Sequence, residues 1–185
     1  FDAMIRYQLE PEIYSLALLK EFTEKIKSAK LKDLFPIHLN IDTGMKRLGF
    51  DFSELALLLS ILDSNKQLKV ASIFSHLAAS GETQWEDFTK EQITKFNESY
   101  KLLAENLKNK PIKHLVNSSG ILRYPEAHFD MVRLGLGLYG INTDKQNDLE
   151  PVGTFKTTIS QIREVKKGES VGYGRVGKLT KDGKI

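Results

Sequence analysis

The feature that most constrains the fold is a repeated alternation between short apolar runs and longer segments with helical periodicity. The runs FPIHLNID (35–42) and LKVASIFSHLA (68–78) are apolar over most of their length, as is typical of strands covered on both faces. Residues 53–64 and about 86–107 instead carry apolar side chains at spacings of three and four. Strands separated by helices of this length predict parallel β/α units, in a barrel or an open sheet.

The complete pattern predicts an α/β region followed by a second, all-β region. We expect strands at 9–14, 35–42, 68–78, 112–119 and 131–141. We expect helices at 15–29, 53–64 and 86–107, with Ser15 and Ser53 as caps of the first two. After residue 142 the chain is first polar, like a linker, and then rich in β-branched residues at 153–165. A turn at 166–169 predicts an antiparallel hairpin of that segment with SVGYGRV.

Composition narrows the classes of partner and compartment. The 185 residues carry a net charge of +3 without a basic stripe, which argues against nucleic acid and anionic membranes as partners. No apolar run approaches the ~20 residues of a membrane span. The lack of cysteine excludes a disulfide framework and suits the cytoplasm. The start FDAMIRYQLEPE, without an initiator methionine, and the end KLTKDGKI indicate a fragment of a longer chain.

Polar residues collect at the predicted carboxyl ends of the strands, where α/β proteins carry their sites. Asp42-Thr43-Gly44 and Arg47 follow one strand, and His76 lies near the end of the next. Asn117-Ser118-Ser119-Gly120 ends a third strand. Its hydroxyls and amides suit a phosphate, more so if a helix begins after residue 119. Ordinary strand-end turns are the alternative interpretation.

Most candidates also have a structural interpretation. Arg133, in a predicted apolar strand, requires an anion or a hydrogen-bond acceptor, so a functional role competes with a structural ion pair. Arg47 can clamp a carboxylate or can pair with Asp42 to hold the turn. His76 and His114 fit a hydrogen-bonded core as well as a catalytic site.

The remaining candidates for a functional site are a glycine, a tyrosine and the histidines. Gly135 has no Cβ and lets backbone approach a ligand. Tyr173, between two glycines, fits surface packing as well as a catalytic phenol, whose pKa nearby cations would have to lower. The four histidines lack metal-ligand spacing, so we expect no metal site. The P-loop, nucleophile-elbow and dinucleotide-binding motifs are absent.

Four blocks in this order resemble the bacterial alanine racemase family: HLNIDTGMKRLGF, FSHLAASGE, HLVNSSGILRYPEAHFDMVRLGLGLYGI and VGYGR. The resemblance implies a pyridoxal-phosphate enzyme with a partial (β/α)8 barrel of the TIM type. Residues 1–142 would be the C-terminal part of the barrel, and 143–185 a linker and the first hairpin of a β-domain. It further implies interconversion of L- and D-alanine on two bases, for peptidoglycan synthesis in the cytoplasm, by a homodimer with shared active sites.

The same resemblance implies a role for each candidate residue. Arg47 matches the arginine that meets the substrate carboxylate and the cofactor's phenolic oxygen, and Arg133 the arginine that faces the pyridine nitrogen. Tyr173 matches a catalytic base that enters the partner subunit's site. His114 matches a histidine that links Arg133 to this tyrosine, and both would act as cations on its pKa. The resemblance assigns the remaining cofactor contacts, to the ring and to the phosphate, to His76, Asn117, Ser118, Gly135 and Leu136.

The chain also departs from the family. Asn40 stands where a lysine, carbamylated in several members, is often found. We expect Asn40 to hydrogen-bond toward Arg47, with an anion or water completing the site. The lysine that anchors the cofactor is not among these 185 residues, so we expect no racemisation by this polypeptide alone. The alternatives are another pyridoxal-phosphate enzyme of this fold type, such as a decarboxylase or a racemase of another amino acid, or a non-catalytic cofactor-binding module.

Overall fold

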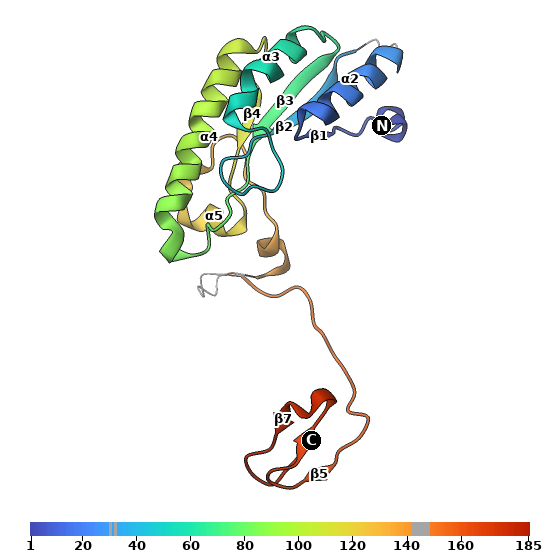
Figure 1. Ribbon diagram of the computed structural model, residues 1–185, viewed down its shortest axis with the longest axis vertical. Helices are drawn as coiled ribbons and strands as arrows, with labels where there is room; N and C mark the ends of the chain where they lie inside the picture. The colour runs from blue at the N-terminus through green and yellow to red at the C-terminus, as the bar shows by residue number, and fades with distance from the viewer. Residues whose placement is uncertain (30, 32, 142–148) are drawn as a thin grey trace. The chain divides into compact units, whose positions relative to one another are not determined.

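The computed structural model describes residues 1–29, 31, 33–141 and 149–185. These form two compact units, residues 1–152 and 153–185 (Figure 1). The predicted domain boundary after residue 142 and most of the predicted linker fall on residues 142–148, outside the described residues. The boundary therefore stays a prediction.

The first unit contains the predicted alternation of strands and helices. Its strands are β1 (Glu12–Ile13), β2 (Phe35–Asn40), β3 (Leu68–Phe74) and β4 (Ile112–His114). Its α-helices are α1 (Asp2–Arg6), α2 (Leu16–Ala29), α3 (Leu55–Asp63), α4 (Glu86–Asn106) and α5 (Ser118–Arg123). Single 3-10 turns are η1 (Phe52–Glu54), η2 (Thr83–Trp85), η3 (Pro125–Ala127) and η4 (Leu136–Tyr139).

The four strands form one parallel sheet in the order β1-β2-β3-β4, which confirms the predicted β/α units. The pairing of β2 with β3 contains a bulge. Ile37 pairs with Val70 but His38 pairs with Ser72, so Ala71 has no partner in the ladder. The bulge changes which residues of β3 share a face with those of β2.

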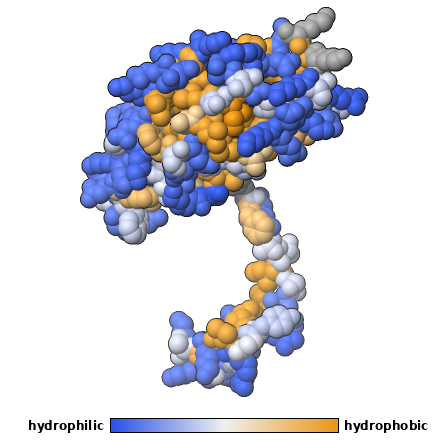
Figure 2. Space-filling model, turned by 45° about the horizontal axis from the view of Figure 1, so that its top comes forward, coloured by the Kyte–Doolittle hydropathy of each residue, from blue (hydrophilic) through white to orange (hydrophobic). Residues whose placement is uncertain are grey.

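Helices α2, α3 and α4 lie along one side of the sheet (Figure 1). The strand residues on that side, such as Ile37, Leu39 and Ile73, are fully buried against the helices' apolar faces. The helices bury apolar residues at helical spacing: Leu19, Phe22 and Ile26 from α2, Leu55, Leu58 and Leu62 from α3, and Ile93, Phe96 and Leu103 from α4. Figure 2 shows hydrophilic side chains over most of the surface, with apolar side chains between them. The other side of the sheet carries polar side chains, described below.

The two predicted caps have different outcomes. Ser15 caps α2 as predicted, because its Oγ accepts a hydrogen bond from the backbone N–H of Leu18 at 3.2 Å. The prediction of Ser53 is wrong, since Asp51 provides the capping side chain, at the start of the turn η1 that leads into α3. Its carboxylate accepts from the N–H of Ser53, and Glu54 accepts in return from the N–H of Asp51, in a capping box.

The predicted strand at 131–141 is wrong. Only Met131 forms a bridge, to His114, and the N–H of Arg133 donates to the carbonyl of Val116 at 3.1 Å. The chain then forms η4 and ends it at Gly140, which is left-handed with φ +76°. Alternating glycines weaken a strand, and no further strand of the described residues covers this edge. The segment therefore follows β4 without joining it in a regular ladder.

The second unit contains short antiparallel pairs, β5 (Glu164–Val165) with β8 (Gly183–Lys184) and β6 (Ser170–Val171) with β7 (Gly177–Lys178). A turn at Lys167–Gly168 follows β5, as predicted. The predicted pairing of 153–165 with the SVGYGRV strand is wrong, because β6 turns through η5 (Tyr173–Arg175) and pairs with β7. Within 153–185 no residue is buried, so local sequence pattern alone did not determine which strands pair.

Candidate active site

The loop after β2 folds back onto the end of its own strand. Asp42 accepts hydrogen bonds from the N–H groups of Gly44 and Lys46 at 2.9 and 3.1 Å, and Phe50 forms a bridge with Ile41. Gly49 is required, because φ is +123° and a Cβ would lie 2.5 Å from the backbone nitrogen of Asp42. The loop is thereby held as a tight reversal at the carboxyl end of β2.

Asp42 does not pair with Arg47, so that alternative for Arg47 is wrong. The ammonium group of Lys46 takes the position instead, 3.2 Å from the Asp42 carboxylate. Burial raises the pKa of Asp42, but the two backbone N–H groups and Lys46 outweigh it and hold the pKa below its usual value. Arg47 itself is exposed on the loop.

His76, just beyond β3, lies within electrostatic range of both arginines of the candidate site. Burial lowers the pKa of His76, and the positive charges of Arg133 and Arg47 lower it further. The structure thus brings residues 47, 76 and 133 to one rim of the sheet. The carbonyl of His76 accepts from the Gln92 side chain at 3.1 Å, which ties the rim to α4.

Asn40 does not point its hydrogen bond toward Arg47, so this expectation is wrong. Its Nδ2 donates to Oε1 of Glu12 at 2.7 Å. The partner lies on β1, where Glu12 is in register with His38 of β2. A carboxylate of the chain itself therefore stands beside Asn40, on the side of the sheet away from the helices.

Arg133 is half-buried and held by neutral acceptors. Its Nη1 donates to Nδ1 of His114 at 2.6 Å, and its Nη2 donates to the carbonyls of Ser75 and Leu115 at 2.6 and 3.0 Å. The guanidinium also lies over the ring of Phe74, at 5.1 Å. Within the described residues no carboxylate forms an ion pair with Arg133, so the alternative of a structural ion pair is wrong. Its charge stays uncompensated by direct contact.

His114 is buried, with 4% of its surface exposed, and stacks on Phe74 with ring centroids 5.0 Å apart. Burial, then the charges of Arg133 and His38, lower its pKa from 6.5 to about 4. His114 is therefore neutral near pH 7. The expectation that His114 acts as a second cation is wrong, because burial beside a guanidinium disfavours its protonation.

Two backbone amides converge on the Ser118 hydroxyl. Its Oγ accepts from the N–H groups of Gly135 and Gly137 at 2.8 and 3.1 Å. Helix α5 begins at Ser118 rather than after residue 119, and Asn117 is its cap, accepting from the N–H of Gly120 at 3.1 Å. Asn117 also accepts from the Ser80 hydroxyl at 2.8 Å, so its carbonyl oxygen is engaged in holding the turn.

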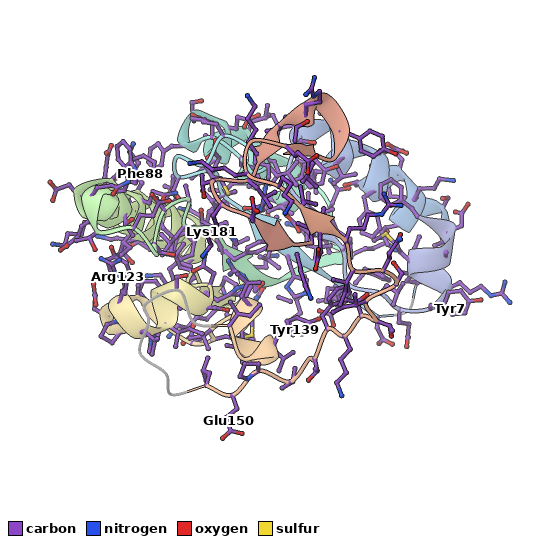
Figure 3. The ribbon with its side chains drawn as sticks, turned by 90° about the horizontal axis from the view of Figure 1, so that it is seen from below. Tyr7, Phe88, Arg123, Tyr139, Glu150 and Lys181 are labelled. Atoms are coloured by element: carbon purple, nitrogen blue, oxygen red, sulfur yellow. The ribbon has the colours of Figure 1, made fainter. Side chains whose placement is uncertain are left out.

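Leu136 and Tyr173 lie on exposed 3-10 turns. Leu136 begins η4, between the two glycines that contact Ser118. Figure 3, seen from below, labels Tyr139 on η4 and Arg123 at the end of α5, the two elements that bracket this corner. Tyr173 belongs to the second unit and is fully exposed, as its flanking glycines predicted.

Several residues on the polar side of the sheet were not predicted. Ser72 and His38 form hydrogen bonds there, and Glu10 joins them from the segment before β1. A polar residue inside an otherwise apolar strand was the available signal for Ser72. This signal could not specify the partner of Ser72, because the bulge at Ala71 decides which residue of β2 lies opposite Ser72.

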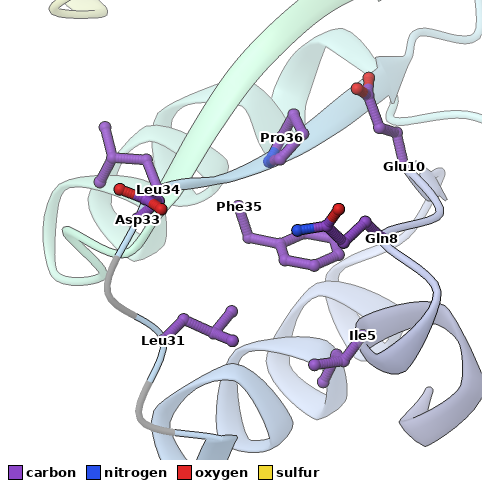
Figure 4. A pocket seen from close by; sticks show the side chains of 8 residues that line it. All are labelled: Ile5, Gln8, Glu10, Leu31, Asp33, Leu34, Phe35 and Pro36. Carbon is purple, nitrogen blue, oxygen red and sulfur yellow. The ribbon is translucent and has the colours of Figure 1, made fainter.

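The first unit carries pockets near both ends of β2. One, of about 360 Å³, is formed beside the amino end of β2 by Ile5, Gln8, Glu10, Leu31, Asp33, Leu34, Phe35 and Pro36 (Figure 4). Another, of about 260 Å³, lies between the loop after β2 and α4. Among the described residues no cluster of His, Asp or Glu could hold a metal ion. In the same part of the chain, every helix is too short or too polar to span a bilayer.

The parallel β/α sheet is that of a partial β/α barrel, and Arg47, His76 and Arg133 come together at its rim. Comparison with known proteins gives the family. Residues 1–143 match the family described as "Alanine racemase, N-terminal domain", and the chain belongs to this family.

Named relatives agree. The alanine racemase of Carboxydothermus hydrogenoformans is 36% identical over 182 residues, covering 94% of this chain and 47% of the relative. That of Syntrophobacter fumaroxidans is 34% identical over 174 residues, covering 92% and 45%. The chain thus spans about half the length of the curated relatives that it matches.

A solved structure supports the fold. It is the alanine racemase from Bartonella henselae "with covalently bound pyridoxal phosphate" and superposes with a TM-score of 0.76, covering 99% of this chain and 49% of the other at 24% identity.

Proposed function

We propose that the whole protein containing this chain interconverts L- and D-alanine with pyridoxal 5'-phosphate as cofactor. Family membership supports the reaction class, and relatives named alanine racemase support the substrate. The observation that carries the proposal is Arg133, a guanidinium at the strand rim whose contacts with the described side chains and carbonyls are all neutral. A permanent cation in that state can address an electron-rich atom of a ligand.

The residues at the rim fit the cofactor. The amides of Gly135 and Gly137 already converge on one oxygen, that of Ser118, which is the arrangement that a phosphate oxygen requires. Leu136 lies between them and would add its own N–H. When bound, the cofactor's ring withdraws electrons from the substrate α-carbon and makes its hydrogen acidic.

Arg133 and Arg47 have different proposed roles, one toward the cofactor and one toward the substrate. Arg133 would face the pyridine nitrogen, where its charge would disfavour protonation of that nitrogen and limit how far the ring stabilises negative charge. His114 orients Arg133 through the bond between Nη1 and Nδ1, at 2.6 Å. Arg47, exposed on the loop after β2, binds the substrate carboxylate in bidentate geometry. His76 would pack beside the ring.

Proton transfer falls to Tyr173 and to a second base, one on each face of the α-carbon. The exposed phenol of Tyr173 suits entry into the site of a partner subunit, so we assign the protein as a homodimer with shared sites. His114 is neutral, so Arg133 is the one of these two residues that carries a positive charge in the proposed site. D-Alanine made in the cytoplasm would supply peptidoglycan synthesis.

The test uses the whole protein with added pyridoxal phosphate, assayed for conversion of L-alanine to D-alanine. We expect Arg133→Met to lower kcat/KM on the order of 10²-fold, as loss of one preorganised cationic contact does. Arg123→Met is the matched control, since Arg123 donates a hydrogen bond to Thr83 at the surface, at 3.2 Å, and its replacement should leave kcat/KM unchanged.

A panel of amino acids separates the alternatives. Preferred turnover of another amino acid, or release of carbon dioxide, would indicate a different enzyme of this fold type. Cofactor binding without any turnover would indicate a binding module. Denaturant unfolding of each variant shows whether a loss of activity reflects loss of fold.

A further inference from the structure

A chain of hydrogen bonds crosses the polar side of the sheet, from the segment before β1 to the residue that addresses the proposed cofactor. Glu10 Oε2 lies 2.7 Å from His38 Nε2, and His38 Nδ1 lies 2.6 Å from Ser72 Oγ. Ser72 Oγ lies 2.9 Å from His114 Nε2, and His114 Nδ1 lies 2.6 Å from Arg133 Nη1. The chain takes one residue from each of β2, β3 and β4.

The direction of every bond in this chain follows from the two ends. A guanidinium only donates, so His114 must accept at Nδ1 and carry its hydrogen on Nε2. Ser72 then accepts from His114 and has its single hydrogen left for Nδ1 of His38. A neutral His38 consequently carries its hydrogen on Nε2 and donates it to Glu10, whose carboxylate only accepts. All donors point from Arg133 toward Glu10.

The bulge in the sheet makes this alignment possible. Ile37 pairs with Val70, and without an unpaired Ala71 the next pair would be His38 with Ala71. Skipping Ala71 places Ser72 opposite His38 and turns its hydroxyl to the polar side. Phe74 then pairs with His114, which stacks on it. A bulge is a recurrent way to redirect one side chain at a functional site.

We propose that Glu10, His38 and Ser72 are positioning residues for Arg133, acting as a one-way relay that holds the His114 imidazole with its Nδ1 lone pair on the guanidinium. This rests on the proposed function, in which Arg133 faces the cofactor. Ser72 is 1% exposed and His114 4%, so water does not replace a lost partner readily. Bonds in such a chain polarise one another, which lets a change at one end reach the other.

Glu10 is the solvent-facing end of the relay. Its carboxyl lies beside the pocket shown in Figure 4, near Pro36 of β2, and its side chain is 46% exposed. Glu12, two residues later, is bonded to Asn40 and to no histidine. Glu10 thus has the hydrogen bond to a histidine that the relay requires, and Glu12 does not.

The first test compares two buried hydroxyls of one chain segment, in protein carrying ¹⁵N-labelled histidine, observed by NMR at pH 8. Ser72→Ala should abolish the slowly exchanging Nε2 proton signal of His114 and shift the ring nitrogens of His38. Ser75→Ala removes a hydroxyl that is equally buried and bonds Thr43 at 2.8 Å, and should leave both histidines unchanged. A His114 proton that persists in Ser72→Ala, or the same loss in Ser75→Ala, overturns the relay.

The second test asks whether a change at Glu10 alters the imidazole of His114 at the other end of the relay. Glu10→Gln should shift the ring resonances of both His38 and His114, although Glu10 does not touch His114. Glu12→Gln removes the same charge from a neighbouring position and should shift His114 less. If Glu10→Gln changes His38 alone, or if the two variants act equally on His114, the proposal fails.

Controls keep the two proposals apart. Denaturant unfolding shows that each variant is folded before its spectra are compared. The spectra need no cofactor, so their failure would leave the proposed racemase function standing. A whole protein without racemase activity but with the expected spectra would leave the relay standing.

Discussion

His114 is a histidine whose surroundings keep it neutral, and this has a consequence for stability. Its pKa in the folded chain is about 4, against an ordinary value of 6.5. Between these values the unfolded chain binds the proton and the folded chain does not. The free energy of unfolding therefore falls as pH falls through this window. The contribution of His114 to that fall is about 3 kcal/mol at pH 4.

We predict that the stability advantage of the wild type over His114→Gln shrinks as pH falls from 6.5 to 4. The variant has no imidazole to protonate, so groups other than His114 affect both proteins alike. Urea unfolding at half-unit pH steps measures the two free energies. A constant difference across this window would show that His114 titrates normally in the folded chain.

At the scale of an element, the start of a helix depends on which residue the preceding loop places at the cap position. Asp51, not Ser53, caps the turn that leads into α3, and the capping box with Glu54 satisfies two backbone N–H groups. Both residues are good caps by type, and the choice between them depends on where the preceding loop places the chain. The loop closes through Phe50, whose N–H and carbonyl bond Asn40 and Asp42. Asp51 follows directly and so occupies the cap position.

We predict that Asp51→Ala lowers the free energy of unfolding by about 1 kcal/mol, as loss of an N-cap does. Ser53→Ala is the control, because its hydroxyl only donates to Asp51 at 2.9 Å in an exposed position. We expect it to change stability by less than about 0.5 kcal/mol. Denaturant unfolding compares the two. Equal losses would mean that Ser53 contributes to the cap as much as Asp51 does.

At the scale of the whole molecule, the rim is assembled but several proposed participants lie elsewhere. Residues 47, 76 and 118 follow strands β2, β3 and β4 of the first unit. Arg133 reaches the same rim from the segment after α5, where it bonds the carbonyls of Ser75 and Leu115. Tyr173 belongs to the second unit. The cofactor-anchoring lysine that the resemblance implies is not among these 185 residues. The groups that we propose for binding and for proton transfer thus lie on more than one unit of the chain.

We predict that the 185-residue polypeptide alone does not racemise alanine, while the whole protein does under the same conditions. The physical reason is the missing covalent anchor and second base, not a defect in Arg47 or Arg133. Circular dichroism of the isolated polypeptide confirms that it is folded before the assay. Racemisation by the polypeptide alone at the level of the whole protein would contradict this assignment of the bases.

The sequence by itself determined the parallel β/α arrangement. The spacing of apolar residues is a local property of each segment and does not depend on the register in which the strands pair. It also predicted which residues stand at the strand rims, because a strand's end is read from the polar residues that follow it. The glycine run at 131–141 behaves differently. Its apolar content predicted a strand, but glycine and an uncovered edge left only a bridge at Met131.

Only the tertiary structure decided which residues form hydrogen bonds with each other on the polar side of the sheet. The partners of Glu10 and Arg133 lie up to 28 and 58 residues away in the chain. Their contact depends on register, and one unpaired residue, Ala71, shifts that register. Ser72 faces His38 for this reason, and Glu12 rather than Arg47 meets Asn40 because neighbouring strands bring them together. Hydrogen bonds act over about 3 Å, so they follow the packing of distant segments, which no local pattern contains.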